Sequence, residues 1–376
     1  MTLGRRHFYL LFALGFLLIR PLSIPAQEKE AKIEKARFTT PDGVELIGSF
    51  YPSAKKNAPV AIMLHAIGVG QNSKNKEWLS LAEALQKSGL AVLTFDFRGH
   101  GQSTEVTLPD MFWAMPANAR NVKSSVKTNI EVKNFDKSYY PILLNDIAAA
   151  RAYLERNKND KGECSTSNII LIGAETGATL GAAWMNTEWY RHKVTPPAMV
   201  GMQAQVDARV EGKDVIAGIW LSITPELGSR KVRLTSLLDQ AVRVNATPMV
   251  FMCSDGDVKG REVARGCEKA LKVAKSEKHR YIAKVELEKS KLVGAGLLQE
   301  SLGSEKAIVN YLKDVVEDKS NEWSEREFRK NQYIWLFPAM AMAPQTFMIA
   351  KPAGENNFNF DNYGTFGDRP WSMLFP

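Results

Sequence analysis

The amino-acid sequence predicts an α/β fold, in which a mostly parallel β-sheet is covered by helices on both faces. Residues 60–64 and 91–95 are continuous apolar runs, and an amphipathic stretch over residues 77–87 separates them. Fully apolar strands are typical of a parallel sheet that is buried on both sides. Because strand and helix patterns then alternate as far as residue 316, the same architecture is expected for most of the chain.

The first predicted element is a β-hairpin. After a charged lead over residues 27–34, the segments 35–40 and 44–51 alternate between apolar and polar residues. The turn Pro41-Asp42-Gly43 joins them, and such a turn between two alternating segments is a hairpin signal.

The later elements follow in regular order along the chain. Strands are expected at residues 60–64, 91–95, 168–172, 215–221, 249–253 and 282–287, and helices at 77–87, 140–156, from about 176, 234–244, 261–275 and 305–316. With the hairpin, these strands make an eight-stranded, mostly parallel sheet in one domain over about residues 35–320.

Two segments depart from this alternation. Residues 102–137 are too long for an ordinary connection and are expected to form an excursion over one edge of the sheet. Residues 321–376 form an extension rich in Trp, Phe, Tyr, Met, Pro and Asn. So many aromatic side chains indicate that the extension packs on the domain's own surface, or on a protein or membrane-surface partner.

The first 26 residues have the organisation of a secretory signal peptide. Arg5 and Arg6 precede a twelve-residue apolar run from Phe8 to Ile19, and Ala26 stands before a charged segment. We therefore expect cleavage near Ala26 and export to the periplasm or the medium, with an uncleaved N-terminal anchor as the alternative.

Charge and cysteine content exclude several classes of function. The chain of 376 residues carries a net charge of +8, of which Arg5, Arg6 and Arg20 leave with the signal peptide. The other basic residues are dispersed among acids, so no nucleic-acid partner is expected. Cys253 and Cys267 either pair in an oxidising compartment or stay buried and inert, and no metal or cofactor motif is found.

Three motifs, in order and spacing, resemble the α/β-hydrolase superfamily over residues 35–317. They are His65-Ala-Ile-Gly68, Asp96-Phe-Arg-Gly-His-Gly-Gln-Ser103 and Gly173-Ala-Glu-Thr-Gly177, each at the end of a predicted strand. The resemblance implies an α/β-hydrolase fold and an ancestral activity on ester or peptide bonds. It also implies an oxyanion-hole-like pair of backbone N–H groups at Ala66 and Thr176.

The nucleophile position of this resemblance is occupied by Glu175. The family pattern is Gly-x-Ser-x-Gly, a strained strand-to-helix turn that needs small flanking residues, and Gly173 and Gly177 preserve it. A glutamate is longer than serine and already ionised, and at a helix N-terminus its carboxylate is expected to fill the oxyanion site itself. Thr176 and Ser103 are the nearby hydroxyls, with turn or helix-start roles as their simpler interpretation.

The other two positions of a hydrolase triad are an acid and a histidine. Asp257 is the better match to the acid position and Asp255 is the alternative, although an Asp beside Gly is also an ordinary turn residue. The segment equivalent to the histidine loop, residues 292–298, contains no histidine. Of the five histidines, His65 and His100 are expected to shape turns, and His7, His192 and His279 are not placed for catalysis.

Three hypotheses follow. The first is a catalytically inactive relative of serine ester or peptide hydrolases, which binds a small molecule or peptide or has a structural role. The second is an active hydrolase that uses Glu175 as a carboxylate nucleophile, although a histidine is normally needed to release the ester intermediate. The third is a component docked by its extension on an outer membrane or a cell-surface assembly.

Overall fold

The structure, a computed structural model, describes residues 32–189, 192–195, 205–208, 211–272, 282–325, 332–336 and 349–353. The expected signal peptide and most of the C-terminal extension lie outside these residues. In the part of the chain that is described, no helix combines the length and the apolar character needed to cross a membrane.

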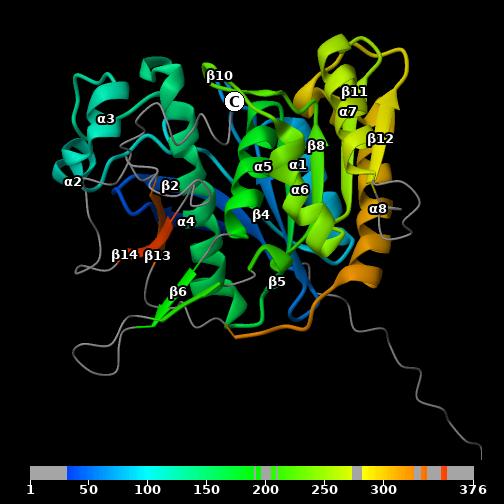
Figure 1. The fold of residues 1–376 in the computed structure, drawn as a ribbon, viewed down its shortest axis with the longest axis horizontal. Coiled ribbons are helices and arrows are strands. Elements are labelled where there is room, and N and C mark those ends of the chain that lie inside the picture. Colours follow the sequence, from blue (N-terminus) through cyan, green and yellow to red (C-terminus); the bar gives the residue numbers. More distant parts are fainter. Residues whose placement is uncertain are drawn as a thin grey trace, which may run out of the picture. The chain divides into compact units, whose positions relative to one another are not determined.

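The centre of the domain is an eight-stranded sheet in the order β1-β2-β4-β3-β5-β8-β11-β12 (Figure 1). Only β1 and β2 pair antiparallel to their neighbours, and the other strands run parallel to one another. The strands are β1 (Glu34–Thr39), β2 (Glu45–Tyr51), β3 (Pro59–Leu64), β4 (Ala91–Phe95), β5 (Ser165–Ala174), β8 (Val215–Leu221), β11 (Met249–Ser254) and β12 (Ile282–Leu287).

Helices cover both faces of this sheet. Alternate residues of each strand point to opposite faces, so Ile62 and Leu64 belong to one apolar cluster and Ala61 and Met63 to the other. The first cluster is closed by α4 (Leu144–Leu154), α5 (Thr176–Glu188), α6 (Leu234–Asn245) and α7 (Val258–Leu271), and the second by α1 (Lys76–Lys87) and α8 (Ser304–Lys319). The predicted fold class, an eight-stranded mostly parallel sheet between two helical layers, is therefore confirmed.

The excursion over residues 102–137 contains two short helices, α2 (Pro109–Ala114) and α3 (Pro116–Asn121). A buried polar network ties it to the domain. Arg98 Nη1 donates to Asp42 Oδ2 at 2.6 Å and its Nε donates to Asp146 Oδ1 at 2.7 Å. Asn118 of α3 donates to the same Asp42 carboxylate at 3.1 Å, and Tyr139 donates to Asn118 at 2.7 Å. The excursion is thus fixed to the opening hairpin.

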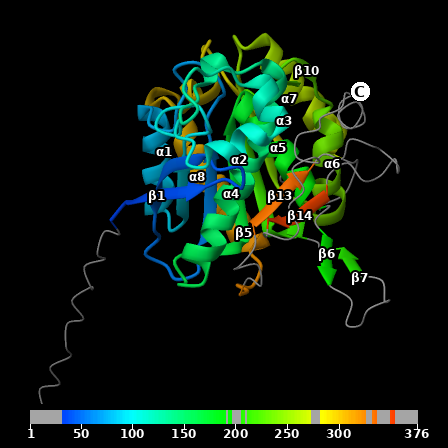
Figure 2. The ribbon, with the colours of Figure 1, turned by 90° about the vertical axis from the view of Figure 1, so that its left-hand side faces the viewer.

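Smaller elements flank the sheet. They are the hairpins β6 (His192–Thr195) with β7 (Gln205–Ala208), β9 (Glu226–Leu227) with β10 (Arg230–Lys231), and β13 (Gln332–Leu336) with β14 (Ile349–Ala353). Figure 2 shows β13 and β14 on the side of the molecule that carries α4, and β13 contacts that helix.

Residues 321–325 form a strap across the N-terminal edge of the sheet. The backbone N–H of Asn321 donates to Asn168 Oδ1 at 2.6 Å, and Asn168 Nδ2 donates back to the carbonyl of Asn321 at 2.9 Å. Asn159 Nδ2 donates to the carbonyl of Ser324 at 3.1 Å. The start of the extension is therefore hydrogen-bonded to the domain.

Candidate functional site

The candidate site lies at the carboxyl edge of the parallel strands. Leu64 at the end of β3 is in register with Gly173 of β5, and Ala174 is in register with Leu221 at the end of β8. The carboxyl ends of parallel strands are where open α/β sheets bind ligands. This register therefore brings the loops that follow β3, β5, β8 and β11 to one edge.

The turn from β5 into α5 keeps the geometry of a nucleophile elbow. Glu175 has φ 48° and ψ −119°, a backbone conformation that L-residues rarely adopt. A Cβ at Gly177 would overlap the carbonyl of His65, and one at Gly173 would meet Ala178 Cα at 2.5 Å. Gly177 is therefore needed because α5 begins in contact with the end of β3, and Gly173 because the first turn of α5 folds back against it.

The side chain of Glu175 turns toward the loop after β12. A Cβ at Gly294, which begins the 3₁₀ turn Gly294–Leu298, would overlap Glu175 Oε1. This turn is part of the segment expected to correspond to a hydrolase histidine loop. Oε1 of Glu175 therefore lies against Gly294, and among the described residues neither Ala66 nor Thr176 donates a backbone hydrogen bond to the carboxylate.

Electrostatics disfavour the ionised form of Glu175. Its side chain is half-buried, and burial raises the pKa of Glu175, with the negative charge of Asp257 as the second cause. No described residue donates a hydrogen bond to this carboxylate. A glutamate in this setting holds a proton more readily than an exposed one.

The two aspartates after β11 have different surroundings. Asp255 accepts hydrogen bonds from the backbone N–H groups of Lys289 at 2.8 Å and Ser290 at 3.0 Å, so it fixes the loop after β12. Asp257 caps α7 by accepting from the N–H of Gly260 at 2.9 Å, and its charge reaches Glu175. The structure therefore brings Asp257 toward the elbow and gives Asp255 a structural contact.

The oxyanion-hole-like positions are present in the backbone. Ala66 follows β3 and is buried, and Thr176 is the first residue of α5. No side chain caps the N-terminus of α5, and neither N–H donates to another described residue. A helix N-terminus with open N–H groups favours a negative charge or a carbonyl oxygen.

The two buried histidines are held in structural roles. His65 Nε2 accepts the N–H of Phe97 at 3.0 Å, so its Nδ1 carries the proton and donates to the carbonyl of Ala66 at 2.7 Å. His100 Nε2 accepts the N–H of Gly68 at 3.1 Å, and its Nδ1 donates to the carbonyl of Arg98 at 2.9 Å. Burial and the neighbouring ring of His100 lower the pKa of His65 to about 3, and burial lowers the pKa of His100. Both rings stay neutral and have no nitrogen free to act as a base.

Of the remaining three histidines, only His192 lies in the part of the chain that the structure describes, and it is not placed to act as a base. His192 begins β6, beyond the C-terminal end of α5, whereas the elbow is at the N-terminal end of that helix. A 13-residue helix is roughly 20 Å long, which separates the two positions. His279 lies outside the described residues, as does His7.

Other expected groups have ordinary positions. Ser103 is buried and its hydroxyl oxygen accepts the N–H of Ile47 at 2.8 Å, while its own N–H donates to the carbonyl of His100 at 2.8 Å within a turn. Cys253 and Cys267 are free and buried, so the disulfide alternative is wrong, and burial raises the thiol pKa values to about 11 and about 12. Among the described residues, no group of three or more acidic, histidine or cysteine side chains is arranged to hold a metal ion.

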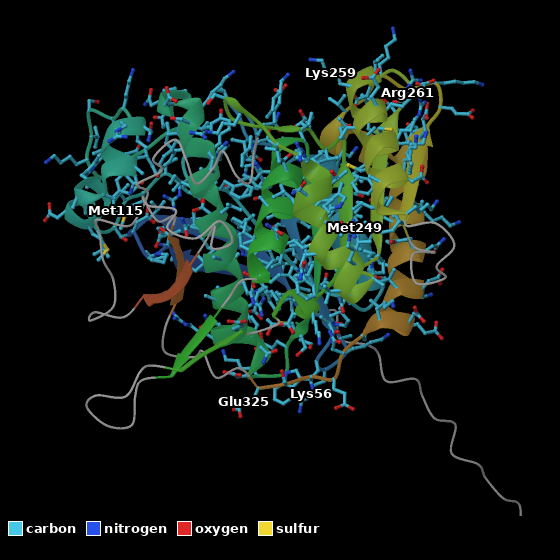
Figure 3. The ribbon with its side chains drawn as sticks, viewed as in Figure 1. Lys56, Met115, Met249, Lys259, Arg261 and Glu325 are labelled. Atoms are coloured by element: carbon cyan, nitrogen blue, oxygen red, sulfur yellow. The ribbon has the colours of Figure 1, made fainter. Side chains whose placement is uncertain are left out.

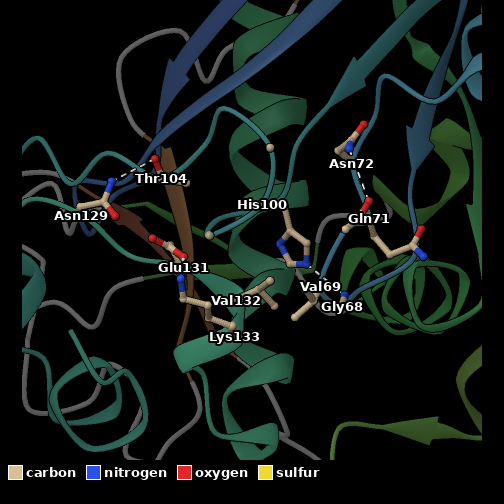
Figure 4. A pocket seen from close by; sticks show the side chains of 13 residues that line it. Gly68, Val69, Gln71, Asn72, His100, Thr104, Asn129, Glu131, Val132 and Lys133 are labelled. Carbon is tan, nitrogen blue, oxygen red and sulfur yellow. Dashed lines mark hydrogen bonds and ion pairs between the residues drawn. The ribbon is translucent and has the colours of Figure 1, made fainter.

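Sequence reasoning missed a pocket next to this edge. It has a volume of about 460 Å³ and lies between the loop after β3, the loop after β4 and the excursion (Figure 4). Its lining residues are Gly68, Val69, Gly70, Gln71, Asn72, Gly99, His100, Gly101, Thr104, Asn129, Glu131, Val132 and Lys133. In the sequence, the only sign of this pocket was the glycines of the loops after β3 and β4, and glycines by themselves indicate turns and not a pocket.

The eight-stranded sheet and the elbow after β5 define an α/β-hydrolase fold. No protein-family model matches the sequence, and no curated protein matches it either. Similar solved structures include a dienelactone hydrolase from Anabaena variabilis, which is 15% identical. Its alignment covers 78% of this chain and 100% of the dienelactone hydrolase, with a TM-score of 0.47. An esterase from Pyrococcus furiosus is 14% identical, with 77% and 92% covered and a TM-score of 0.47. An α/β hydrolase from a Penicillium species is 15% identical, with 77% and 99% covered and a TM-score of 0.47.

Proposed function

We propose that this protein is an exported member of the α/β-hydrolase fold that does not hydrolyse esters or peptides and acts by binding a ligand or as a structural component. The observation that carries the proposal is the contact between Glu175 and Gly294. At this contact a carboxylate stands where the fold's nucleophile would be, and a glycine stands in the loop where its base is expected.

The chemistry of acyl transfer supports this proposal. The nucleophile and the base act as a unit, and removing either one leaves only modest catalysis from the remaining backbone donors. Glu175 carries no hydroxyl to deprotonate, and His65 and His100 have both ring nitrogens engaged. The open N–H groups of Ala66 and Thr176 are suited to bind a carbonyl or carboxylate oxygen without reacting with it.

The alternative, in which Glu175 is a carboxylate nucleophile, is opposed by its surroundings. Its raised pKa increases the protonated fraction, which is not nucleophilic. An ester formed on Glu175 also needs a base to activate water, and no described side chain beside it is a histidine. Asp257 is the charged group that acts on the pKa of Glu175, and its side chain already caps α7.

The test is hydrolysis of short-chain p-nitrophenyl esters by the purified mature protein, beside Glu175→Ser and Glu175→Ala variants. We expect no turnover above the uncatalysed rate in any of the three. Turnover in the unmodified protein that disappears in Glu175→Ala would overturn the proposal and establish a carboxylate mechanism. N-terminal sequencing of the secreted protein tests export, with a new N-terminus expected at Gln27.

A further inference from the structure

The pocket beside the elbow has preformed walls. Gly68 donates its N–H to His100, and Val132 donates its N–H to the carbonyl of Gly99 at 2.9 Å, so the loops after β3 and β4 and the excursion are bonded to one another. Asp96 accepts from the N–H and the hydroxyl of Ser73 at 2.8 and 2.7 Å and from the N–H of Gln102 at 2.9 Å. Such a site needs little ordering when a ligand enters, which favours binding.

One side of the pocket is polar without net charge. Asn129 Nδ2 donates to Thr104 Oγ1 at 3.1 Å, which leaves its side-chain carbonyl oxygen open, and Lys133 pairs with Glu131 at 2.5 Å. These four side chains lie together on one side in Figure 4. They offer hydrogen-bond donors and acceptors, and because the two charges neutralise each other, they do not select a charged ligand.

The middle of the pocket is apolar. Val69 and Val132 lie between the polar side and Asn72 in Figure 4, with the ring of His100 beside them. Val69 is 75% exposed, the highest value among the large exposed apolar side chains of the described residues. Covering it removes apolar surface from water, which stabilises a bound molecule.

We propose that this pocket binds a small uncharged polyhydroxy compound of the size of a mono- or disaccharide. The C–H face of such a ligand packs on Val69 and Val132, and its hydroxyl groups exchange hydrogen bonds with Asn129, Thr104 and Glu131. The volume of about 460 Å³ falls within the range of small-molecule sites. Glu175, Thr176 and Asp257 do not line the pocket, so binding is independent of whether the elbow is inert.

The experiment is isothermal titration calorimetry of the mature protein with glucose, N-acetylglucosamine and maltose, beside glucosamine and glucose 6-phosphate as charged probes. We expect at least one neutral sugar to bind with a Kd of about 1 mM or tighter, and each charged probe to bind more weakly than glucose. Hydrogen exchange with the bound sugar should slow at residues 68–72 and 129–133. No binding of any neutral sugar, or tighter binding of a charged probe, would overturn the proposal.

Variants separate this site from the elbow. Val69→Asp and Glu131→Ala should each weaken the sugar by about tenfold or more, whereas Val126→Asp should leave its affinity unchanged. Val126 is a matched control because it is also exposed, at 54%, and belongs to the excursion without lining the pocket. Glu175→Ala should also bind normally. Equal affinity in Val69→Asp and in the unmodified protein, with both folded by circular dichroism, would place the ligand elsewhere and overturn the proposal.

Discussion

The side chain of Glu175 occupies the space that any side chain at Gly294 would need. The two residues are far apart in the sequence, and the contact exists because the loops after β5 and β12 meet at one edge of the sheet. The glutamate at the elbow therefore requires a residue without a side chain in the facing loop. The energetic coupling between these two positions can be measured.

Gly294→Ala should destabilise the protein by more than its backbone conformation alone explains. Gly294 has φ +55°, so alanine there costs about 1–2 kcal/mol of strain, and its Cβ also overlaps Glu175. Gly303→Ala is the matched control, because Gly303 has φ +65° and nothing within 4 Å of an added Cβ. Urea unfolding gives both free energies. In a Glu175→Ala background the cost of Gly294→Ala should fall to that of Gly303→Ala, and an unchanged cost would refute the coupling.

Glu175→Gln should stabilise the protein at neutral pH and not at low pH. The pKa of Glu175 is higher in the folded state than in the unfolded chain, where it is about 4.3. Its protonated form therefore favours folding below the unfolded pKa, and this contribution is lost as the pH rises through the folded pKa. Melting temperatures should be higher for Glu175→Gln at pH 7.5 and equal near pH 4. Exposed Glu226, changed to Gln, is the control, and a pH-independent difference would contradict the explanation.

Glu175→Ser combined with Gly294→His should gain ester hydrolysis that neither single change provides. Serine vacates the space beside Gly294, and histidine tolerates positive φ better than most residues. The open N–H groups at Ala66 and Thr176 already suit an oxyanion. The expected readout is p-nitrophenyl acetate turnover in this double variant, with none when Gly294→His is combined with Glu175→Ala instead. Equal rates in the double variant and in Glu175→Ser would show that Gly294 is not in reach of the elbow.

Arg98→Leu should cost about 3–5 kcal/mol of stability, because it leaves the buried carboxylates of Asp42 and Asp146 without their cation. The matched control is Arg37→Leu, which removes an ion pair to Glu45 from a side chain that is 56% exposed. That loss should stay below about 1 kcal/mol. Both free energies come from urea unfolding at one pH. Similar losses would mean that the buried network does not hold the excursion in place.

The sequence predicted most of the fold because apolar runs specify buried strands. The β8 strand, Val215–Leu221, has the predicted bounds because it is a fully buried apolar run between two polar residues. The β12 strand, Ile282–Leu287, also has the predicted bounds, although its apolar residues alternate with Lys and Glu and most of its side chains are only partly buried. The expected helix over residues 140–156 is instead a 3₁₀ segment, Lys137–Leu143, followed by α4. Pro141 lacks the N–H that an α-helix would use there. The hairpin of β6 and β7 was missed because its four-residue strands give little periodicity.

The candidate site was only partly predictable. Spacing placed Glu175 on the elbow and Asp257 after β11, because motif positions follow from the order of strands. The direction of the Glu175 side chain was not predictable, since it depends on an empty space at Gly294 in a loop more than a hundred residues away. The pocket also depends on how the excursion folds back onto the loops after β3 and β4, which composition does not specify.

The strap over residues 321–325 fixes where the rest of the extension starts. Figure 3 shows Glu325 and Lys56 at one end of the molecule and Lys259 and Arg261 at the other. The first end is the N-terminal edge of the sheet, and the second carries the elbow, so the ten residues of β5 separate them by roughly 30 Å. A ligand in the pocket therefore does not compete for space with the strap. The molecule therefore has two functionally separate ends: one is closed by the strap, and the other carries the elbow and the pocket.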